Sequence, residues 1–522
     1  MDDADGDSGD TAPEGDGGRP HRPVSGSTVV LAAAIVASIG FRLINLVGLP
    51  GEMYGDIAIV HEYVEEIRRG NWPTSFTLSS GPLYHYLIMP VVWVGGSGFT
   101  SLKIASVAVS ALVLWATYLF AKEVADQRVA ATSLFVAGVS SWLLVFSRLG
   151  NSQIVTAVLA MAALYFAARV ARRVARWSAA ACGAMAGLGM YGYPQSFVVA
   201  PTVLVVLVLL WRNRSGVRGR DIGVFVVAVV VTAVPFLIIV AVDPVNFTSG
   251  YIGGKIQSRT GTLETIAHNA WRALLALHID GDVVFRSNPA GAPHLDALSG
   301  LLFVLGVGYW LAPQRRRWWP IVLLPLVLLQ IPSMLVLASE SEVPSASRTV
   351  LVAPLVYVVT ASGLCWLAAA VHRSATVRRV VAATLLCLVA VVNGQRYVGA
   401  YADGLPNKNV PFGRIIADSF ADLPDGTHAF IVGCCWGEYG QPEPKGITFL
   451  DAGPVATGMI ELARDTLDCA QLAGLPRPAV LVWSPANDLP APALAACPDG
   501  LDGELHIAGG YPVFRSVILD QP

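Results

Sequence analysis

Long apolar runs recur along the chain from Ser27 to Arg396, and short polar or charged segments separate them. A helix of about twenty apolar residues spans the hydrocarbon core of a bilayer, and its backbone polar groups are satisfied within the helix. The pattern therefore predicts a polytopic α-helical membrane protein with about eleven transmembrane helices. The predicted spans are residues 29–48, 101–121, 129–147, 152–171, 178–193, 194–211, 222–241, 297–313, 319–338, 348–371 and 380–396.

The two ends of the chain differ from this membrane domain, residues 29–396. Residues 1–28 are polar, rich in Asp and Gly and without Phe, Tyr or Trp, which predicts a disordered acidic tail. Residues 397–522 alternate strand-like runs with helical ones, so we expect a small soluble α/β domain. The expected strands are HAFIVGCC, GITFL, AVLVWS and PVFRSVIL, and the expected helix is GMIELARDTLDCAQLAG.

Composition strengthens the membrane interpretation. Of the 522 residues, 54% are hydrophobic and 14% are charged, whereas charged residues make up roughly a quarter of a soluble domain. The first apolar run is too long for the core of a signal peptide and is expected to remain as a span. The C-terminal segment has no nucleotide-binding glycine motif. We therefore expect the lipid bilayer, and not nucleic acid, as a partner.

Arginine clusters predict the orientation of the chain. Short loops rich in Arg and Lys face the cytoplasm, and the span assignment places all such loops on one side. They are residues 122–128, 169–176, 212–220, 315–317 and 373–379. The N-terminus is then cytoplasmic and the C-terminal domain extracytoplasmic in a multi-pass plasma-membrane protein. Large outer loops cover residues 49–100 and 242–296, and the apolar segment 81–94 is too short to span and is expected at the membrane surface.

The seven cysteines fall into two groups. Cys182, Cys365 and Cys387 lie in apolar runs, where small packing residues are the simpler interpretation. The C-terminal domain holds Cys434, Cys435, Cys469 and Cys497 without a CxxC pair, so zinc is not expected. An oxidising outer compartment permits disulfides. We expect one that joins Cys469 or Cys497 to Cys434 or Cys435, with four free thiols as the alternative.

Candidate chemistry lies on the expected outer face. Asp56 follows the first span closely, where a carboxylate can act as a general base or simply cap a helix. Arg148, Arg286 and Arg348 all fall at the outer membrane boundary. Arginine suits bidentate binding of phosphate, although each arginine alone is more often a membrane anchor or part of an ion pair.

Several of these stretches resemble one family. The stretches are Asp56, GPLYHYL, SRLGNSQ, GLGMYGYP, the segment from Arg286 through Asn288 to Asp296, and the segment around Arg348. Together they resemble the GT-C superfamily of membrane glycosyltransferases. The resemblance is to the bacterial members of glycosyltransferase family thirty-nine, which include protein O-mannosyltransferases, aminoarabinose transferases and RgtA/B/C/D-like proteins.

The resemblance implies roles for particular residues. Asp56 would be the catalytic base, and Arg286 and Arg348, ranked above Arg148, would bind the donor phosphate. The substrate pocket would include Tyr84, His85, Asn151, Asn288 and Asp296. Ile57 follows Asp56 where the family usually has Glu, and Asn151 and Gln153 stand where many members carry a second acid. These departures make a divalent metal doubtful, and we expect no cofactor.

The implied activity is inverting transfer of a sugar from a polyprenyl-phosphate donor to an extracytoplasmic acceptor that the sequence does not identify. Two other functions remain open at this point. One is a flippase or transporter of lipid-linked sugars, which would need polar residues within the spans. The other is a non-catalytic relative that takes part in cell-envelope assembly, because the residue after Asp56 is not an acid.

Overall fold

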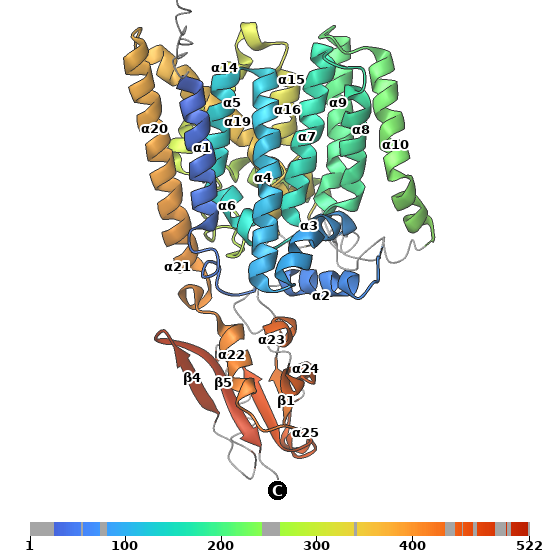
Figure 1. Ribbon diagram of the computed structural model, residues 1–522, viewed down its shortest axis with the longest axis vertical. Helices are drawn as coiled ribbons and strands as arrows, with labels where there is room; N and C mark the ends of the chain where they lie inside the picture. The colour runs from blue at the N-terminus through green and yellow to red at the C-terminus, as the bar shows by residue number, and fades with distance from the viewer. Residues whose placement is uncertain are drawn as a thin grey trace, which may run out of the picture.

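The computed structural model describes residues 26–53, 56–73, 81–242, 262–338, 342–433, 444–450, 453–462, 467–485, 497 and 503–519. Figure 1 shows an upright bundle of helices with a small sheet domain beneath it. The helices of the membrane part are α1 (Gly26–Leu43), α2 (Asp56–Arg68), α3 (Pro82–Gly95), α4 (Phe99–Val124), α5 (Gln127–Val139), α6 (Ser141–Arg148), α7 (Gln153–Arg172), α8 (Ser178–Leu188), α9 (Val199–Arg212), α10 (Gly219–Val242), α13 (Thr262–Leu275), α14 (Ala297–Leu311), α15 (Trp319–Val322), α16 (Leu324–Leu328), α17 (Ile331–Met334), α18 (Ala346–Thr349), α19 (Ala353–Val371) and α20 (Ala375–Gln395).

The predicted fold class, a polytopic α-helical membrane protein with a small α/β domain, is confirmed. Six described helices are long and apolar enough to cross a membrane, and α5 with α6 can form a seventh, bent span. The other predicted spans coincide with the shorter helices α1, α8, α14 and α15–α17. The first span ends earlier than expected, because the chain turns after Leu43 instead of continuing as a helix to residue 48.

Two predicted spans are broken for identifiable reasons. The segment 129–147 bends by 62° between α5 and α6, where the Ser140 hydroxyl accepts a bond from the Leu143 amide (3.3 Å) and the Ser141 amide donates to Asn393 (2.9 Å). The segment 319–338 is three short helices, each with a proline in its first turn. Proline lacks an amide hydrogen and cannot continue the preceding helix.

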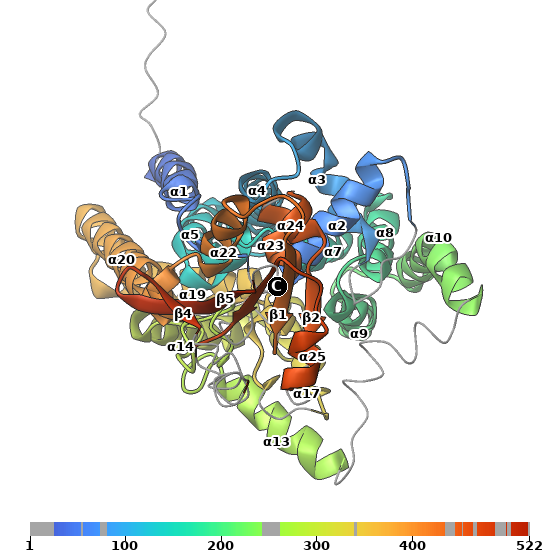
Figure 2. The same cartoon turned by 90° about the horizontal axis from the view of Figure 1, so that it is seen from below.

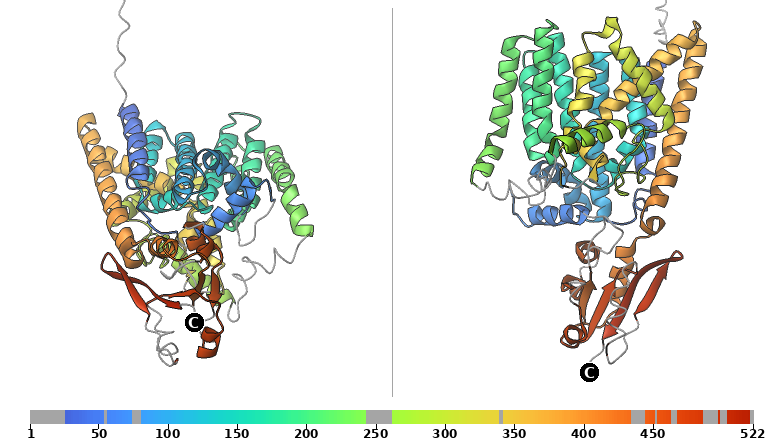
Figure 3. Two further views of the ribbon diagram at one scale, coloured as in Figure 1. Left: turned by 60° about the horizontal axis from the view of Figure 1, so that its bottom comes forward. Right: turned by 180° about the vertical axis from the view of Figure 1, so that it is seen from behind.

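The predicted outer loops contain helices that do not span the bundle. Helices α2 and α3 lie across the end of the bundle beside the sheet domain (Figure 1). In the loop 242–296, α13 runs crosswise to the long helices (Figures 2 and 3). The sequence pattern predicted that residues 81–94, which contain α3, do not span the membrane. It did not predict the helix α13.

The start of α1 and the C-terminal domain lie at opposite ends of the bundle (Figure 1). The basic loops meet at the end that holds the start of α1: Arg173 donates to the Gly216 carbonyl (3.0 Å) and Arg317 to the Ala171 carbonyl (2.8 Å). This arrangement fits the predicted clustering of Arg-rich loops. The side of the membrane on which these loops lie stays a prediction.

The C-terminal domain is a mixed α/β unit. Its sheet has the strand order β2-β1-β3-β5-β4, with β1 parallel to β2 and β3, and β5 antiparallel to β3 and β4. Its elements are α21 (Ala402–Gly404), α22 (Phe412–Ala421), β1 (His428–Val432), α23 (Pro444–Leu450), α24 (Pro454–Thr457), β2 (Ile460–Leu462), α25 (Cys469–Ala473), β3 (Ala479–Trp483), β4 (Glu504–Ala508) and β5 (Tyr511–Leu519); a π-helix, Arg396–Tyr401, links α20 to α21.

Three predictions within this domain are wrong. The expected strand GITFL lies in α23, where Pro444 starts a helix and Ile447 is buried. The expected long helix 458–474 instead contains strand β2, which pairs with β1, and among its described residues the helix α25 begins at Cys469. In both segments, packing against other parts of the domain outweighs the local preference of the residues for strand or helix. The disulfide joins Cys469 to Cys497, so the expected pairing with Cys434 or Cys435 is wrong, and these two residues lie outside the described segments.

Candidate active site

Asp56 is the first residue of α2, and the loop before it is held from three directions. Lys103 of α4 is buried and donates to the carbonyls of Leu46 (2.9 Å) and Val47 (3.0 Å). From the C-terminal domain, Asn409 donates to the carbonyl of Gly48 (2.7 Å). A buried amine that bonds several carbonyls fixes a loop that has no regular structure of its own. The loop that leads from α1 toward the candidate base is therefore anchored at several of its described residues.

Glu52 gives the third anchor. Its carboxylate is buried and accepts bonds from the amides of Met53 (2.9 Å) and Gly413 (2.6 Å), so it caps the first turn of α22. A side chain at position 413 would not fit, because a Cβ there would lie 2.7 Å from a Glu52 oxygen. Burial raises the pKa of Glu52 to about 7, while the two amides and Arg414 act to lower it.

This pKa gives a testable pH dependence. The pKa of Glu52 is higher in the folded protein, at about 7, than the ordinary value of 4.5. The stability that Glu52 adds is therefore fully present below pH 4.5 and is lost as the pH rises through about 7. We expect the Tm of the wild type, measured relative to that of Glu52→Gln, to fall between about pH 5 and pH 8. A difference in Tm that is independent of pH would contradict this prediction.

Arg148, at the end of α6, is the most deeply buried candidate. Its side chain is 1% exposed. It donates to the Phe41 carbonyl (3.1 Å) and stacks over Tyr397 (5.1 Å to the ring centroid). Its Nε and Nη2 groups have no hydrogen-bond partner among the described residues. A buried charge normally has a partner, so these two N–H groups are suited to an anionic ligand.

The turn that follows Arg148 lies beside the first turn of α2. Gly150 has φ +76°, and a Cβ there would lie 3.7 Å from the Ile57 side chain. Ile57 is buried and is the next residue after Asp56. The segment that carries the candidate base thus lies close to the turn that ends α6.

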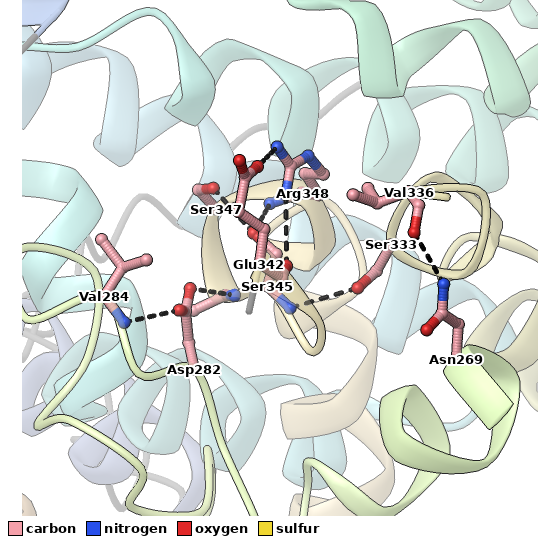
Figure 4. A network of polar contacts seen from close by, with 10 residues as sticks. Asn269, Asp282, Val284, Ser333, Val336, Glu342, Ser345, Ser347 and Arg348 are labelled. Carbon is pink, nitrogen blue, oxygen red and sulfur yellow. Dashed lines mark hydrogen bonds and ion pairs between the residues drawn. The ribbon is translucent and has the colours of Figure 1, made fainter. Parts of the chain in front are cut away.

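Arg348 lies in α18 within a network of polar contacts (Figure 4). Its guanidinium forms an ion pair with Glu342 and donates to the Glu342 carbonyl (3.3 Å). Asp282, which is buried, accepts bonds from the amides of Ala346 (2.7 Å) and Val284 (2.8 Å). Burial raises the pKa of Asp282 to about 6, although Arg348 and Arg286 both act to lower it. Arg348 therefore already has a carboxylate partner in Glu342, and the carboxylate of Asp282 belongs to the same network.

The structure links the three candidate arginines through neighbouring groups. Trp142 of α6 donates to the Ala346 carbonyl of α18 (3.3 Å), so the helices of Arg148 and Arg348 are adjacent. Tyr401 donates to the Arg286 carbonyl (3.0 Å) and stacks on Tyr397 (5.3 Å between centroids), the ring under Arg148. The segments that carry the three arginines are therefore connected through these contacts.

The five predicted pocket residues each have identifiable contacts. Tyr84 and His85 are buried in α3; Tyr84 bonds Ser106 of α4 (2.6 Å), and His85 Nδ1 lies 3.2 Å from the Gly81 carbonyl. Asn151 is buried and accepts a bond from Ser152 (3.2 Å). These contacts position the side chains within the protein, and their role in a pocket stays a prediction.

Asn288 and Asp296 shape the loop before α14. Asn288 donates to the carbonyls of Pro289 (2.9 Å) and Ala292 (2.6 Å). Asp296 caps α14 by accepting from the Ser299 amide (2.9 Å), and its other oxygen accepts from Asn393 (2.9 Å). Asp296 thus serves as a helix cap, and the ion pair of Arg348 is with Glu342.

Sequence reasoning did not single out Glu52, Lys103, Asp282 or Glu342. Asp282 and Arg286 are four residues apart, a spacing typical of charge pairs, and this signal could have drawn attention to Asp282. No such signal exists for Glu52 and Gly413, which are 361 residues apart. Among the described residues, no group of three or more His, Cys, Asp or Glu side chains could hold a metal ion.

The overall fold is similar to that of solved glycosyltransferases. ArnT from Cupriavidus metallidurans bound to undecaprenyl phosphate is 16% identical, covers 94% of this chain and 97% of its own, and has a TM-score of 0.59. The same protein in its apo state is 15% identical, covers 94% of this chain and 98% of its own, and has a TM-score of 0.60. AglB from Archaeoglobus fulgidus, in complex with an inhibitory peptide and a dolichol-phosphate, is 13% identical, covers 88% of this chain and 70% of its own, and has a TM-score of 0.52.

The chain thus has the fold of these GT-C membrane glycosyltransferases. Residues 79–239 match the family described as dolichyl-phosphate-mannose-protein mannosyltransferase. At identities of 13–16% the structural likeness shows the fold alone. No curated protein sequence matches the chain significantly.

Proposed function

We propose that this protein transfers a sugar, with inversion, from a polyprenyl-phosphate donor to an acceptor on the outer face of the membrane. One observation carries the proposal: the buried guanidinium of Arg148 has two N–H groups without a partner among the described residues, and the turn after its helix lies beside Ile57, the residue that follows Asp56. The segments that carry the candidate anion site and the candidate base thus lie close together. The solved relatives include complexes with undecaprenyl phosphate and with a dolichol-phosphate, which supports a donor of this class.

The proposed step is a single displacement. The acceptor oxygen attacks the anomeric carbon as the bond from that carbon to the phosphate oxygen breaks. Asp56 takes the proton of the acceptor hydroxyl. The leaving group is the polyprenyl phosphate, whose added negative charge would be stabilised by Arg148, together with Arg286 and Arg348. The donor lipid would reach the site through the bilayer.

A non-catalytic function in envelope assembly is the second candidate. It is favoured by Ile57, which follows Asp56 where the family usually has Glu, and by the amide of Asn151 where many relatives have an acid. The two candidates differ in one measurement, the release of polyprenyl phosphate from a labelled polyprenyl-phosphate sugar in proteoliposomes. Release that depends on Asp56 supports the enzyme, and no release with any sugar or acceptor tested supports the non-catalytic function.

The proposed transfer requires the predicted orientation. We expect reporters fused at the N-terminus and in the loop 212–220 to report the cytoplasm, and a reporter after Arg396 to report the outside. The basis is the placement of all basic loops at the end of the bundle opposite the C-terminal domain. The disulfide between Cys469 and Cys497 agrees with an oxidising outer compartment. A cytoplasmic C-terminus would remove the proposed base from the donor side of the membrane.

A further inference from the structure

A groove on the lateral surface of the bundle lies between α14 and α19, near the end that holds the basic loops. Its volume is about 520 Å³. Its walls are mostly apolar and include Val304, Leu305 and Gly308 of α14 and Trp366 of α19. Val304 is 55% and Trp366 is 46% exposed, so the groove opens to the medium around the protein. Around a spanning bundle that medium is lipid.

Glycines set the shape of the groove. Where α14 and α19 meet, a Cβ at Gly306 would lie 1.9 Å from the Val359 carbonyl oxygen, and a Cβ at Gly363 would lie 2.0 Å from the Leu302 carbonyl oxygen. The two backbones are therefore in direct contact, which small residues allow between membrane helices. Gly308 differs, because a Cβ there would lie in open space, with no other described atom within 4 Å. The missing side chain at position 308 leaves room in the groove for an apolar chain.

One cationic side chain lies at the polar end of the groove. Arg315 follows the end of α14 and lines the groove together with Gln314. Among the described residues of the lining, Arg315 is the only charged one. Its guanidinium lies over the Tyr309 ring, 4.7 Å from the centroid. Stacking on an aromatic face leaves the N–H groups at the edge of a guanidinium available to an anion.

The charged groups near Arg315 have contacts elsewhere in the protein. Arg317 donates to the Ala171 carbonyl (2.8 Å). Asp126 lies near enough to Tyr309 to act on it electrostatically, but its carboxylate accepts bonds from two amides at the start of α5 and does not line the groove. Arg315 forms no ion pair with a carboxylate of the described segments. The polar end of the groove is therefore positive.

We propose that this groove binds one anionic phospholipid. An acyl chain lies along Val304, Gly308 and Trp366, and the phosphate accepts hydrogen bonds from Arg315. Aromatic side chains such as Tyr309 and Trp366 are favoured at the depth where headgroups meet acyl chains, and basic sites between spanning helices bind anionic headgroups. A zwitterionic headgroup would bring its own cation beside Arg315, so the site prefers a lipid with net negative charge. This inference does not depend on the proposed transfer.

The test uses the full-length protein in phosphatidylcholine nanodiscs. They contain the same small fraction of either phosphatidylglycerol or phosphatidylcholine that carries a photoreactive diazirine on an acyl chain. After irradiation, mass spectrometry of peptides counts the adducts on α14 and α19. Adducts on α10, whose Leu237 and Ile238 are exposed, measure general contact with lipid. We expect the ratio of phosphatidylglycerol to phosphatidylcholine adducts to be several-fold higher on α14 and α19 than on α10.

Two variants remove the two parts of the site. Arg315→Gln removes the charge, and Gly308→Leu fills the groove at a position with open space for a side chain. Both should lower the ratio on α14 and α19 to the value on α10. Arg316→Gln is the matched control, because Arg316 is the exposed neighbour that does not line the groove, and it should leave the ratio unchanged. The Tm of each variant establishes that it is folded.

Three results would overturn the proposal. Equal ratios on α10 and on the helices of the groove in the wild type would mean that the groove does not select a headgroup. A fall in Arg316→Gln as large as that in Arg315→Gln would mean that general surface charge attracts the lipid. Fewer adducts of both lipids on α14 and α19 than on α10 would mean that a second copy of the chain covers the groove.

Discussion

Replacing Asp56 with Asn should abolish sugar transfer and leave the protein folded. The amide has nearly the shape of the carboxylate and can still serve at the first turn of a helix, but it cannot accept the proton of the acceptor hydroxyl. A general base contributes about 10²- to 10⁴-fold to the rate. The loss should appear in kcat, with the KM for the donor nearly unchanged, in an assay of polyprenyl phosphate release.

A matched control is available at the other end of the bundle. Asp126 caps α5 by accepting bonds from the amides of Arg128 (2.8 Å) and Val129 (3.0 Å). Asp126→Asn makes the same chemical change at a helix N-terminus, far from the proposed site, and should leave the rate unchanged. Wild-type turnover in Asp56→Asn would assign Asp56 to helix capping alone and withdraw the mechanism.

Replacing Arg148 with Lys should raise the KM for the donor about ten- to a hundredfold. This range corresponds to the roughly 1.5–3 kcal/mol lost with a charge-assisted contact at a buried site. Lysine keeps the charge but cannot offer two N–H groups in the fixed geometry of a guanidinium. The sequence ranked Arg286 and Arg348 above Arg148. The contacts lead us to place Arg148 above Arg348, because Arg348 forms an ion pair with Glu342 and Arg148 has no such partner among the described residues.

Arg348→Lys is the informative comparison. If Arg348 mainly anchors its loop through Glu342, the variant should lose thermal stability, while the protein that remains folded shows a smaller change in donor KM. Donor kinetics and Tm are measured on the same Lys variants of Arg148, Arg286 and Arg348, so that binding and folding effects are separated. Normal donor kinetics in all three variants would exclude these arginines from the donor site.

The amino-acid sequence alone determined the class of protein and the course of most spans. The length of an apolar run can be read from the sequence alone, and within the bilayer each spanning helix must satisfy the hydrogen bonds of its own backbone. A span such as residues 153–172 can therefore be assigned without knowledge of the helices around it. Proline acts locally as well, and the prolines at positions 320, 325 and 332 account for the broken segment between 319 and 334. Asp56 and the three arginines were found because the ends of spans are recognisable in the sequence.

The tertiary structure decided how those residues are held. The cap of α22 by Glu52 and the bond from Ala346 to Asp282 join segments that are 361 and 64 positions apart, and no local pattern predicts such pairs. The pairing of Cys469 with Cys497 and the helical form of residues 446–450 likewise depend on which elements pack together. The local pattern of apolar and polar residues indicates whether a segment faces lipid or water. The partner of a buried charge, in contrast, is set by packing between segments that are distant in the sequence. The sequence could therefore identify the candidate groups, and only the fold could show which of them already have a partner.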